Sequence, residues 1–295
     1  MGLEARATLR RPFAIGRRGF VVLAIVLSAV AALVVLDAPF RALLPQRGGF
    51  AIVRAFFAAM FHPAIGYETA VPAGTPSLLA EALAAARRTV VFAAAAMSLA
   101  IVAGFVLGFF ASTAWWRDPA VGGAGARRRG RRALAGTVWA ATRVLIVGMR
   151  SVHELLWAVI FLAAFGLNTA SAVLAIAIPY AGTLAKVFSE MIDEAPRDSA
   201  IAMQAAGAGA AQAFCFGLLP RALPDMCAYS FYRFECAVRS SAVLGFFGFP
   251  TLGYSISAAF ENLHYSEVWT YLDVLAVLVV AIEIWSGSLR RRFVA

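Results

Sequence analysis

The chain has 295 residues, of which 62% are apolar and 14% charged, and its mean hydropathy is +0.79. A soluble domain averages about 45–50% apolar and about 25% charged residues, so this composition excludes a soluble globular protein and a disordered chain. The net charge of +10 comes almost entirely from arginines in short clusters beside apolar runs, which indicates orientation in a bilayer rather than nucleic-acid binding. The three cysteines lack metal-ligand spacing. We therefore predict an all-α integral membrane protein without a metal site.

A membrane-spanning helix needs roughly 20 mainly apolar residues, and the hydropathy pattern predicts six of them. The predicted spans are Phe20–Leu36, Thr89–Ser112, the second half of Val138–Gly166, Ala170–Met191, Tyr229–Phe249 and Val268–Ser286. In the third, an interfacial helix up to Met149 is expected to bend into a span from about Leu155 to Gly166. Phe50–Phe61 is predicted to be a short amphipathic surface helix. The stretch Trp115–Ala133 is predicted to be an aqueous loop.

The arginines also predict the orientation of the chain. Sixteen lie in residues 1–19, 113–136, 192–224 and the C-terminal tail, against three in residues 37–80, 167–169 and 250–267. By the positive-inside rule, both termini and the 192–224 segment are expected to be cytoplasmic. Arg10-Arg11-Pro12-Phe13 also resembles a twin-arginine export signal, but no cleavage site follows Leu36, so an uncleaved first span is favoured.

The 192–224 segment is too long for a simple connector between two spans. Its pattern predicts a helix around Ile201, a glycine at the helix end at Gly207, a second helical turn, and a stop at Leu219-Pro220. Two short helices projecting from the bilayer would either insert into a groove on a soluble partner or form an ordinary interfacial hairpin. Shape alone does not decide between these two interpretations.

The residues of this segment resemble the EAA loop of the permease subunits of ABC importers. The matching positions are Ala202, Gly207, Ala208, Leu219 and Pro220. The resemblance implies that these residues couple the chain to an ATP-binding subunit. Ile201 stands where the family has a glutamate, a departure that bears on the strength and polarity of the docking.

Two further stretches narrow the resemblance to phosphonate-type ABC permeases, and it extends from about residue 80 to the C-terminus. The first is Met149–Ala158. The second has two matching parts on one predicted helix, Tyr232-Arg233-Phe234-Glu235 and Val238–Gly245. The resemblance implies the type I ABC-importer permease fold, with an N-terminal arm at residues 1–76 and a permease core at 77–295 containing the coupling loop at about 192–224. After the last stretch, Phe249-Pro250 replaces a glycine-rich run, which predicts a more rigid outer mouth and a smaller transported molecule.

The resemblance also implies a setting and a set of partners. The setting is the bacterial inner membrane, with a second permease copy or a paralogue, two ATP-binding ABC subunits and a periplasmic binding protein. The implied cargo is a small phosphorus-containing anion of the phosphonate, phosphite or hypophosphite class. The chain itself is expected to hold no cofactor, because ATP and magnesium would bind to the partner subunits.

Ionised side chains inside the spans must face protein or water, because each costs about 2.5–3.5 kcal/mol at a helix centre. Glu235 and Arg239 are four residues apart and are predicted to pair, while Arg233 is expected to extend to the cytoplasmic interface. Candidates for lining an anion path are Arg239, Ser240, Ser241, Tyr180 and His153. The alternatives are a structural pair for Arg239, simple packing for Tyr180, and a hydrogen-bonded helix-end position for His153.

The sequence lacks a GxxxxGK[ST] phosphate loop, an HExxH motif and a GxSxG nucleophile motif, so we predict a transport subunit and not an enzyme. Three alternatives remain. The first is an ABC-importer permease for another small solute such as an amino acid. The second is a gradient-driven secondary transporter or channel. This alternative predicts inverted repeats, which the sequence does not show. The third, a membrane enzyme, lacks a convergent catalytic set.

Overall fold

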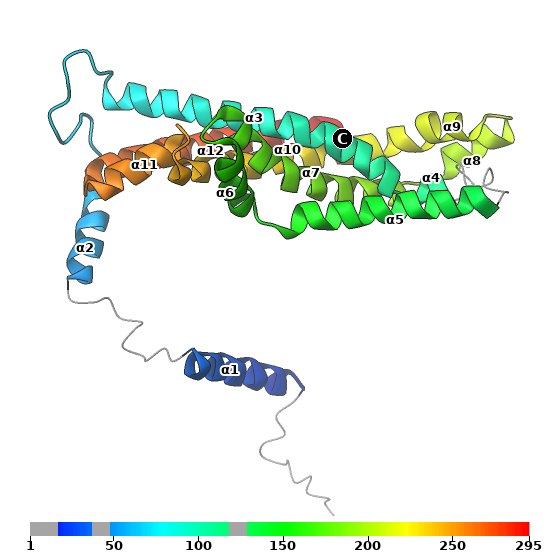
Figure 1. The fold of residues 1–295 in the computed structure, drawn as a ribbon, viewed down its shortest axis with the longest axis horizontal. Helices are drawn as coiled ribbons and strands as arrows, with labels where there is room; N and C mark the ends of the chain where they lie inside the picture. Colours follow the sequence, from blue (N-terminus) through cyan, green and yellow to red (C-terminus); the bar gives the residue numbers. More distant parts are fainter. Residues whose placement is uncertain (1–16, 37–47, 118–128, 295) are drawn as a thin grey trace, which may run out of the picture. The chain divides into compact units, whose positions relative to one another are not determined.

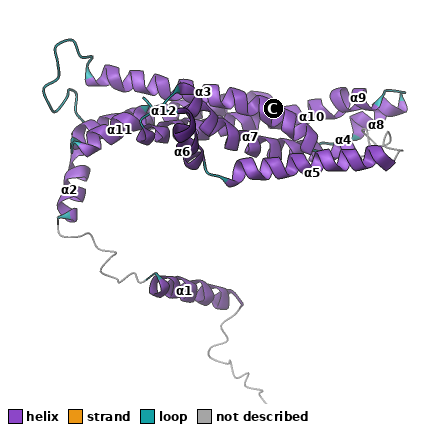
Figure 2. Ribbon diagram, viewed as in Figure 1, coloured by secondary structure: helices purple, strands orange, loops and turns teal. Residues whose placement is uncertain are grey.

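The computed structural model describes residues 17–36, 48–117 and 129–294. Within these ranges every regular element is helical (Figures 1 and 2), which confirms the all-α prediction. The twin-arginine-like pair Arg10-Arg11 lies outside the described residues, as does the middle of the predicted aqueous loop. The chain divides into two units, residues 1–58 and 59–295, which are described separately.

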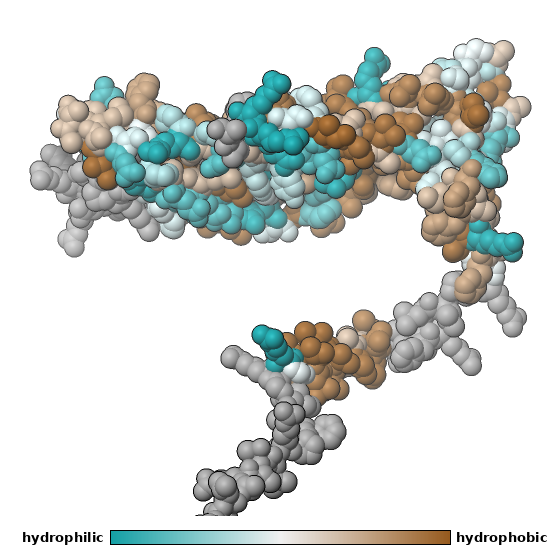
Figure 3. All heavy atoms as spheres, turned by 180° about the vertical axis from the view of Figure 1, so that it is seen from behind, coloured by the Kyte–Doolittle hydropathy of each residue, from teal (hydrophilic) through white to brown (hydrophobic). Residues whose placement is uncertain are grey.

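The first unit contains α1 (Arg17–Val35) and nearly all of α2 (Gly49–Ala59). The 19 residues of α1 extend roughly 28 Å at 1.5 Å per residue, close to the thickness of the hydrocarbon core. Apolar side chains cover most of the visible surface of α1 (Figure 3), as expected for a helix surrounded by lipid. The helices predicted at Phe20–Leu36 and Phe50–Phe61 are both confirmed.

The second unit is a bundle of long helices joined by short ones. Its elements are α3 (Leu78–Ala111), α4 (Thr113–Arg117), α5 (Arg129–Ser151), α6 (Glu154–Phe165), α7 (Thr169–Glu194), α8 (Asp198–Ala205), α9 (Ala210–Gln212), a π-helical segment (Ala213–Leu218), α10 (Leu219–Val243), a 3₁₀ turn (Leu244–Phe247), α11 (Leu252–Glu261) and α12 (Tyr265–Val294). Among the described residues four helices are long and apolar enough to cross a membrane, and two bent pairs raise the number to six. The predicted set of six spans agrees with this upper number.

The centre of the bundle is α7, which packs along α3 and α5 through small residues. A Cβ atom on Gly104 of α3 would lie 2.7 Å from the Cβ of Leu184, and one on Gly182 of α7 would lie 2.8 Å from the Cβ of Met149. Glycine at these positions lets the helix backbones approach closely, which is how helices gain packing energy where lipid removes the hydrophobic drive. The core is therefore built around α7.

The bend predicted in Val138–Gly166 is confirmed. It separates α5 from α6, which has 12 residues and turns by 89°, and both helices pack against α7. Arg143 interrupts the apolar run of α5. In the structure Arg143 Nε donates to Ala111 O at 3.1 Å, so this charge is satisfied inside the bundle.

The two ends of the second unit differ in what they carry. In Figure 1, α4, α8 and α9 lie at one end of this unit, and α11 lies at the other. The short helices α8 and α9 belong to the segment for which the sequence predicts a coupling role.

Candidate functional site

The first candidate site is the projecting segment, which we define as residues 198–218. Its first helix, α8, ends at Gly207, whose φ of +91° is in the left-handed region that favours glycine. Gly207 N donates to Gln204 O and Ala208 N donates to Met203 O, both at 2.9 Å. These bonds satisfy carbonyls that the helix end leaves open. The predicted helix end at Gly207 is therefore confirmed.

The predicted stop at Leu219-Pro220 is wrong, because these residues begin α10. Pro220 lies in the first turn of that helix, where a missing backbone N–H removes no hydrogen bond. The π-helical segment leads from α9 directly into α10, so the second half of the projecting segment and the long helix form one continuous rod. Leu219 is half-buried, and Pro220 is exposed.

One face of the projecting segment packs tightly against the rest of the protein. A Cβ on Gly217 would lie 2.8 Å from the Cα of Ala200, so the π-helical segment and α8 touch backbone to backbone. The Phe214 ring lies 5.2 Å from Phe109 and 5.4 Å from Trp115, centroid to centroid. These contacts fix the segment on the ends of α3 and α4.

The projecting segment also carries exposed apolar residues, which together are called its exposed face here. Phe216 is 72% exposed and Ile201 is 51% exposed, and Ala202 and Gly207 are exposed beside them. Ala208, also predicted to take part in coupling, is half-buried. Because contiguous exposed apolar residues mark interaction surfaces, this face is a candidate docking surface for a partner.

A hydrogen-bonded base holds the projecting segment. The Asp193 carboxylate at the end of α7 accepts bonds from Ser112 Oγ at 2.6 Å and from Thr113 N at 2.8 Å. Arg197 Nη2 donates to Asp193 O at 2.7 Å, which satisfies a carbonyl at the C-terminus of α7. The ends of α3, α4 and α7 thus form one connected support.

The second candidate site is a chain of polar side chains that leads from the exposed His153 to the buried Tyr180. His153 Nε2 lies 3.5 Å from Glu154 Oε2, and Ser240 Oγ donates to Glu154 Oε1 at 2.9 Å. Since serine has a single hydroxyl proton, the 2.9 Å bond between Tyr180 and Ser240 has the tyrosine as donor. The Arg233 guanidinium lies over the Tyr180 ring at 4.5 Å. This polar chain joins α6, α7 and α10.

Two nitrogen donors in and near the polar chain are buried and unsatisfied within the described part of the protein. Arg233 Nε and Trp157 Nε1 are buried without a hydrogen-bond partner among the described residues. Trp157 lies three residues after Glu154 on α6, so both side chains project from the same side of that helix. An unsatisfied buried donor costs about 1–3 kcal/mol, and an anionic oxygen is the acceptor that relieves most of this cost.

The structure places the remaining candidate residues apart from this chain. Ser241 is fully buried and donates to Thr89 O at 2.9 Å, in the contact between α10 and α3. Arg239 is exposed, and its Nη2 lies 3.8 Å from Cys236 Sγ. Of the predicted path residues, His153, Tyr180 and Ser240 are therefore brought together, while Ser241 and Arg239 are not.

Two predictions for the charges of α10 are wrong. Glu235 pairs with Arg290 of α12 at 3.0 Å instead of with Arg239, because Arg290 reaches the largely buried Glu235 carboxylate from the neighbouring helix. Arg233 does not extend to the interface but lies over the Tyr180 ring. Both corrections come from contacts between helices that are distant in sequence.

Comparison with known proteins places the chain in a family. The model of the family described as "Binding-protein-dependent transport system inner membrane component" matches residues 123–294. The chain belongs to this family. It is therefore a multi-pass inner-membrane protein of the ABC-importer permease type, as the resemblance of its sequence motifs predicts.

Curated relatives of this permease carry names that refer to phosphorus compounds. It is 35% identical over 159 residues, 53% of the chain, to the phosphite transport system permease protein PtxC of Stutzerimonas stutzeri. It is 30% identical over 233 residues, 79% of the chain, to the phosphate-import permease protein PhnE of Mycolicibacterium smegmatis. The matches span 57% of the first relative and 41% of the second, so the chain aligns with only about half the length of these relatives.

Solved structures support the fold of this permease. The methionine ABC transporter MetNI in an inward-facing conformation contains a chain with a TM-score of 0.57 and 19% identity, covering 72% of this chain and 95% of that chain. A chain of an amino acid ABC transporter with histidines has a TM-score of 0.55 and 16% identity, with coverages of 72% and 94%. At these identities the likeness shows the fold alone.

Sequence reasoning missed Trp157 and Asp193. Trp157 lies inside the Met149–Ala158 stretch, so the motif itself contained the signal. Asp193 follows an apolar run and precedes the projecting segment, a position typical of a residue that caps a neighbouring helix.

Proposed function

We propose that the chain is the membrane-spanning permease subunit of an ATP-driven ABC importer that passes a small phosphorus oxyanion or phosphonate. The observation that carries this proposal is the family match together with relatives named for phosphite and phosphate transport. The amino acid transporters among the solved structures support the fold and leave the cargo open.

The polar chain supports the choice of an anion as cargo. Arg233 and Trp157 offer buried N–H groups that lack acceptors among the described residues, in a region that lipid cannot solvate. A phosphite or phosphonate oxygen that reaches either group would accept its N–H. The free energy gained is modest, as transport requires, because a tightly held anion would not be released.

The projecting segment supports coupling to an ATP-binding subunit. Its exposed apolar face fits a groove on a soluble partner, and its base is tied to the ends of α3, α4 and α7. The assembly proposed here contains two such ATP-binding subunits, a second copy of the permease or a paralogue, and a soluble binding protein. Both termini and the projecting segment are cytoplasmic in this proposal.

The cargo is tested by uptake in cells that carry the complete transporter. We expect deletion of the chain to abolish uptake of one labelled probe among phosphite, methylphosphonate and phosphate, and the wild-type gene to restore it. Excess unlabelled methionine should not compete. Uptake of all three probes unaffected by deletion, or competition by methionine, would refute the phosphorus-anion proposal.

The polar chain is tested in the same assay by Arg233→Met and Trp157→Phe. A charge-assisted hydrogen bond contributes about 1.5–3 kcal/mol, so Arg233→Met should reduce uptake about ten- to hundredfold at unchanged protein level. Arg292→Met removes the same charge from an exposed position at the end of α12 and serves as the matched control. Equal uptake by the Arg233 and Arg292 variants would exclude the polar chain from the path.

A further inference from the structure

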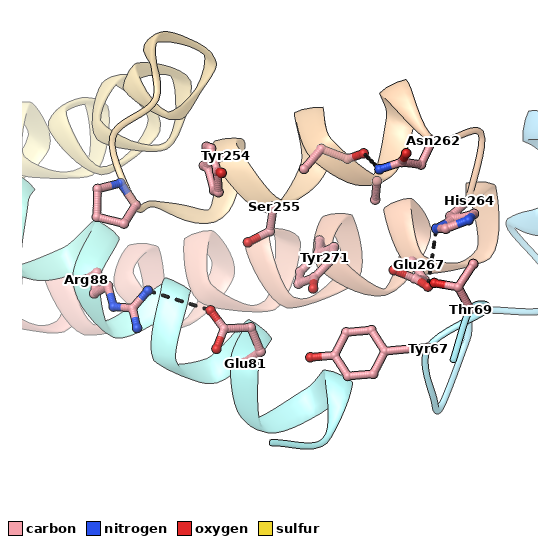
Figure 4. A pocket seen from close by; sticks show the side chains of 13 residues that line it. Tyr67, Thr69, Glu81, Arg88, Tyr254, Ser255, Asn262, His264, Glu267 and Tyr271 are labelled. Carbon is pink, nitrogen blue, oxygen red and sulfur yellow. Dashed lines mark hydrogen bonds and ion pairs between the residues drawn. The ribbon is translucent and has the colours of Figure 1, made fainter. Parts of the chain in front are cut away.

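A second, unrelated polar site lies at the end of the second unit that carries α11, opposite the projecting segment. It is a recess of about 340 Å³ (Figure 4). Three parts of the chain build its walls: the segment before α3, the first turns of α3, and the α11–α12 pair. The functional groups that line it are two carboxylates, those of Glu81 and Glu267, and three tyrosines, Tyr67, Tyr254 and Tyr271.

The recess is held open by hydrogen bonds across its wall. Glu267 Oε1 accepts a bond from Glu68 N at 2.6 Å, and Glu68 Oε1 accepts one from Ser266 N at 3.0 Å. This reciprocal pair ties the segment before α3 to the start of α12. The Glu267 side chain is only 8% exposed, and its Oε1 also lies 3.5 Å from His264 Nδ1. The recess thus offers a preformed carboxylate whose position the surrounding backbone fixes.

The charge of the recess favours a cation. Its lining contains the carboxylates of Glu81 and Glu267 against one guanidinium, that of Arg88, which lies 3.6 Å from Glu81. The other basic group is the His264 imidazole, 3.5 Å from Glu267. The Tyr67 hydroxyl points toward Glu81 in Figure 4. Burial, and then the carboxylates of Glu81 and Glu267, raise the pKa of the Tyr67 phenol, as a negative potential does. An anionic cargo is repelled here, whereas a guanidinium or ammonium finds carboxylates and aromatic rings.

We propose that this recess receives an arginine or lysine side chain of the soluble binding protein that loads the transporter. The proposal rests on the importer function proposed above. The family description states that transport depends on a binding protein. In the proposed importer the ATP-binding subunits dock on the projecting segment. The recess lies at the opposite end of this unit, so it faces the side from which a binding protein arrives.

The partner is first identified by photocrosslinking in cells that contain the complete transporter. Tyr254 is half-exposed at the recess, and it is replaced by benzoylphenylalanine. We expect a crosslink to a soluble binding protein, at a peptide that contains an arginine or lysine. The same substitution at Phe216, on the projecting segment, should not capture that protein. Absence of a soluble binding protein from the Tyr254 crosslinks, or its capture from Phe216 instead, would overturn the proposal.

Affinity is then measured with the purified binding protein and the transporter complex in lipid nanodiscs. Because glutamine keeps the carbonyl that Glu68 N requires, Glu267→Gln combined with Glu81→Gln preserves the wall and removes its charge. We expect this variant to raise the binding-protein concentration for half-maximal ATPase stimulation at least about tenfold, as loss of a buried charge pair does. It should also lose most of the salt dependence of that concentration.

The matched control is Glu261→Gln, which removes the same charge from an exposed position on α11 outside the recess. It should remain within about twofold of wild type, because exposed charges contribute little. An equal effect of the control and the double variant would show a general surface potential and overturn the recess proposal. If the wild-type complex is not stimulated by the binding protein, the importer function fails. If it is stimulated and the double variant matches it, only the recess proposal fails.

Discussion

Gly217→Ala tests whether the projecting segment transmits force between the permease and an ATP-binding subunit. The added Cβ would lie 2.8 Å from the Cα of Ala200 and 2.9 Å from its backbone nitrogen. Carbon atoms in contact stand about 3.5–4.0 Å apart, so α8 must move by roughly 1 Å, because its backbone cannot rotate aside as a side chain does. Overpacking of this kind costs about 1–3 kcal/mol.

The cost falls on the contact that aligns α8 with the start of α10, so the exposed face of α8 is displaced relative to its base. At about 1.4 kcal/mol per factor of ten, we expect binding of the ATP-binding subunit and ATP-driven uptake in proteoliposomes to fall about five- to hundredfold. Membrane insertion should be unchanged. Gly148→Ala on α5 is the control, because no atom lies within 4 Å of its added Cβ. Uptake by Gly217→Ala within twofold of that control would refute the role assigned to the segment.

Three further predictions concern stability. Gly253→Ala places a Cβ 2.0 Å from Ala242 O, so we expect little folded protein by fluorescence-detected size exclusion; a wild-type elution profile would contradict this packing. Glu235→Gln and Arg290→Gln should couple by about 0.5–1.7 kcal/mol in a double-mutant cycle of unfolding, whereas strictly additive effects would mean that their 3.0 Å pair contributes nothing. Asp193→Asn should lower the free energy of unfolding by about 1–3 kcal/mol, because the new amide NH2 group is itself a donor and would face the donors Ser112 Oγ and Thr113 N. An unchanged thermal midpoint would count against the role of Asp193 in supporting the projecting segment.

Local chemistry made the helix end at Gly207 and the number of spans predictable. Lipid imposes a length of about 20 apolar residues on a span, and a left-handed turn strongly favours glycine, so both constraints can be read from a short window. Leu219-Pro220 was misread because proline is compatible with both a helix end and a helix start. The choice depends on the π-helical segment before it, which has no sequence signature of its own.

The errors in α10 have a different cause. A hydropathy window treats every charged residue as a cost, but the cost disappears when another helix supplies a partner. Arg143 finds Ala111 O, and Glu235 finds Arg290, both across long separations in sequence. The same limit applies to Ser240 and Ser241. Neighbouring residues on a helix point about 100° apart, so one enters the polar chain and the other the contact with α3, and only the packing decides which.

The two polar sites differ in the groups that they present, and this difference bears on how cargo would enter. Inside the bundle, Arg233 Nε and Trp157 Nε1 have no acceptor among the described residues, which favours a passing anion. In the recess the carboxylates of Glu81 and Glu267 disfavour a free anion at that end. In the proposed importer, an anion in free solution would therefore gain nothing by collecting at the recess. Delivery by a carrier that covers the carboxylates with its own basic side chain removes this barrier, so the recess would favour carrier-bound cargo over free anions.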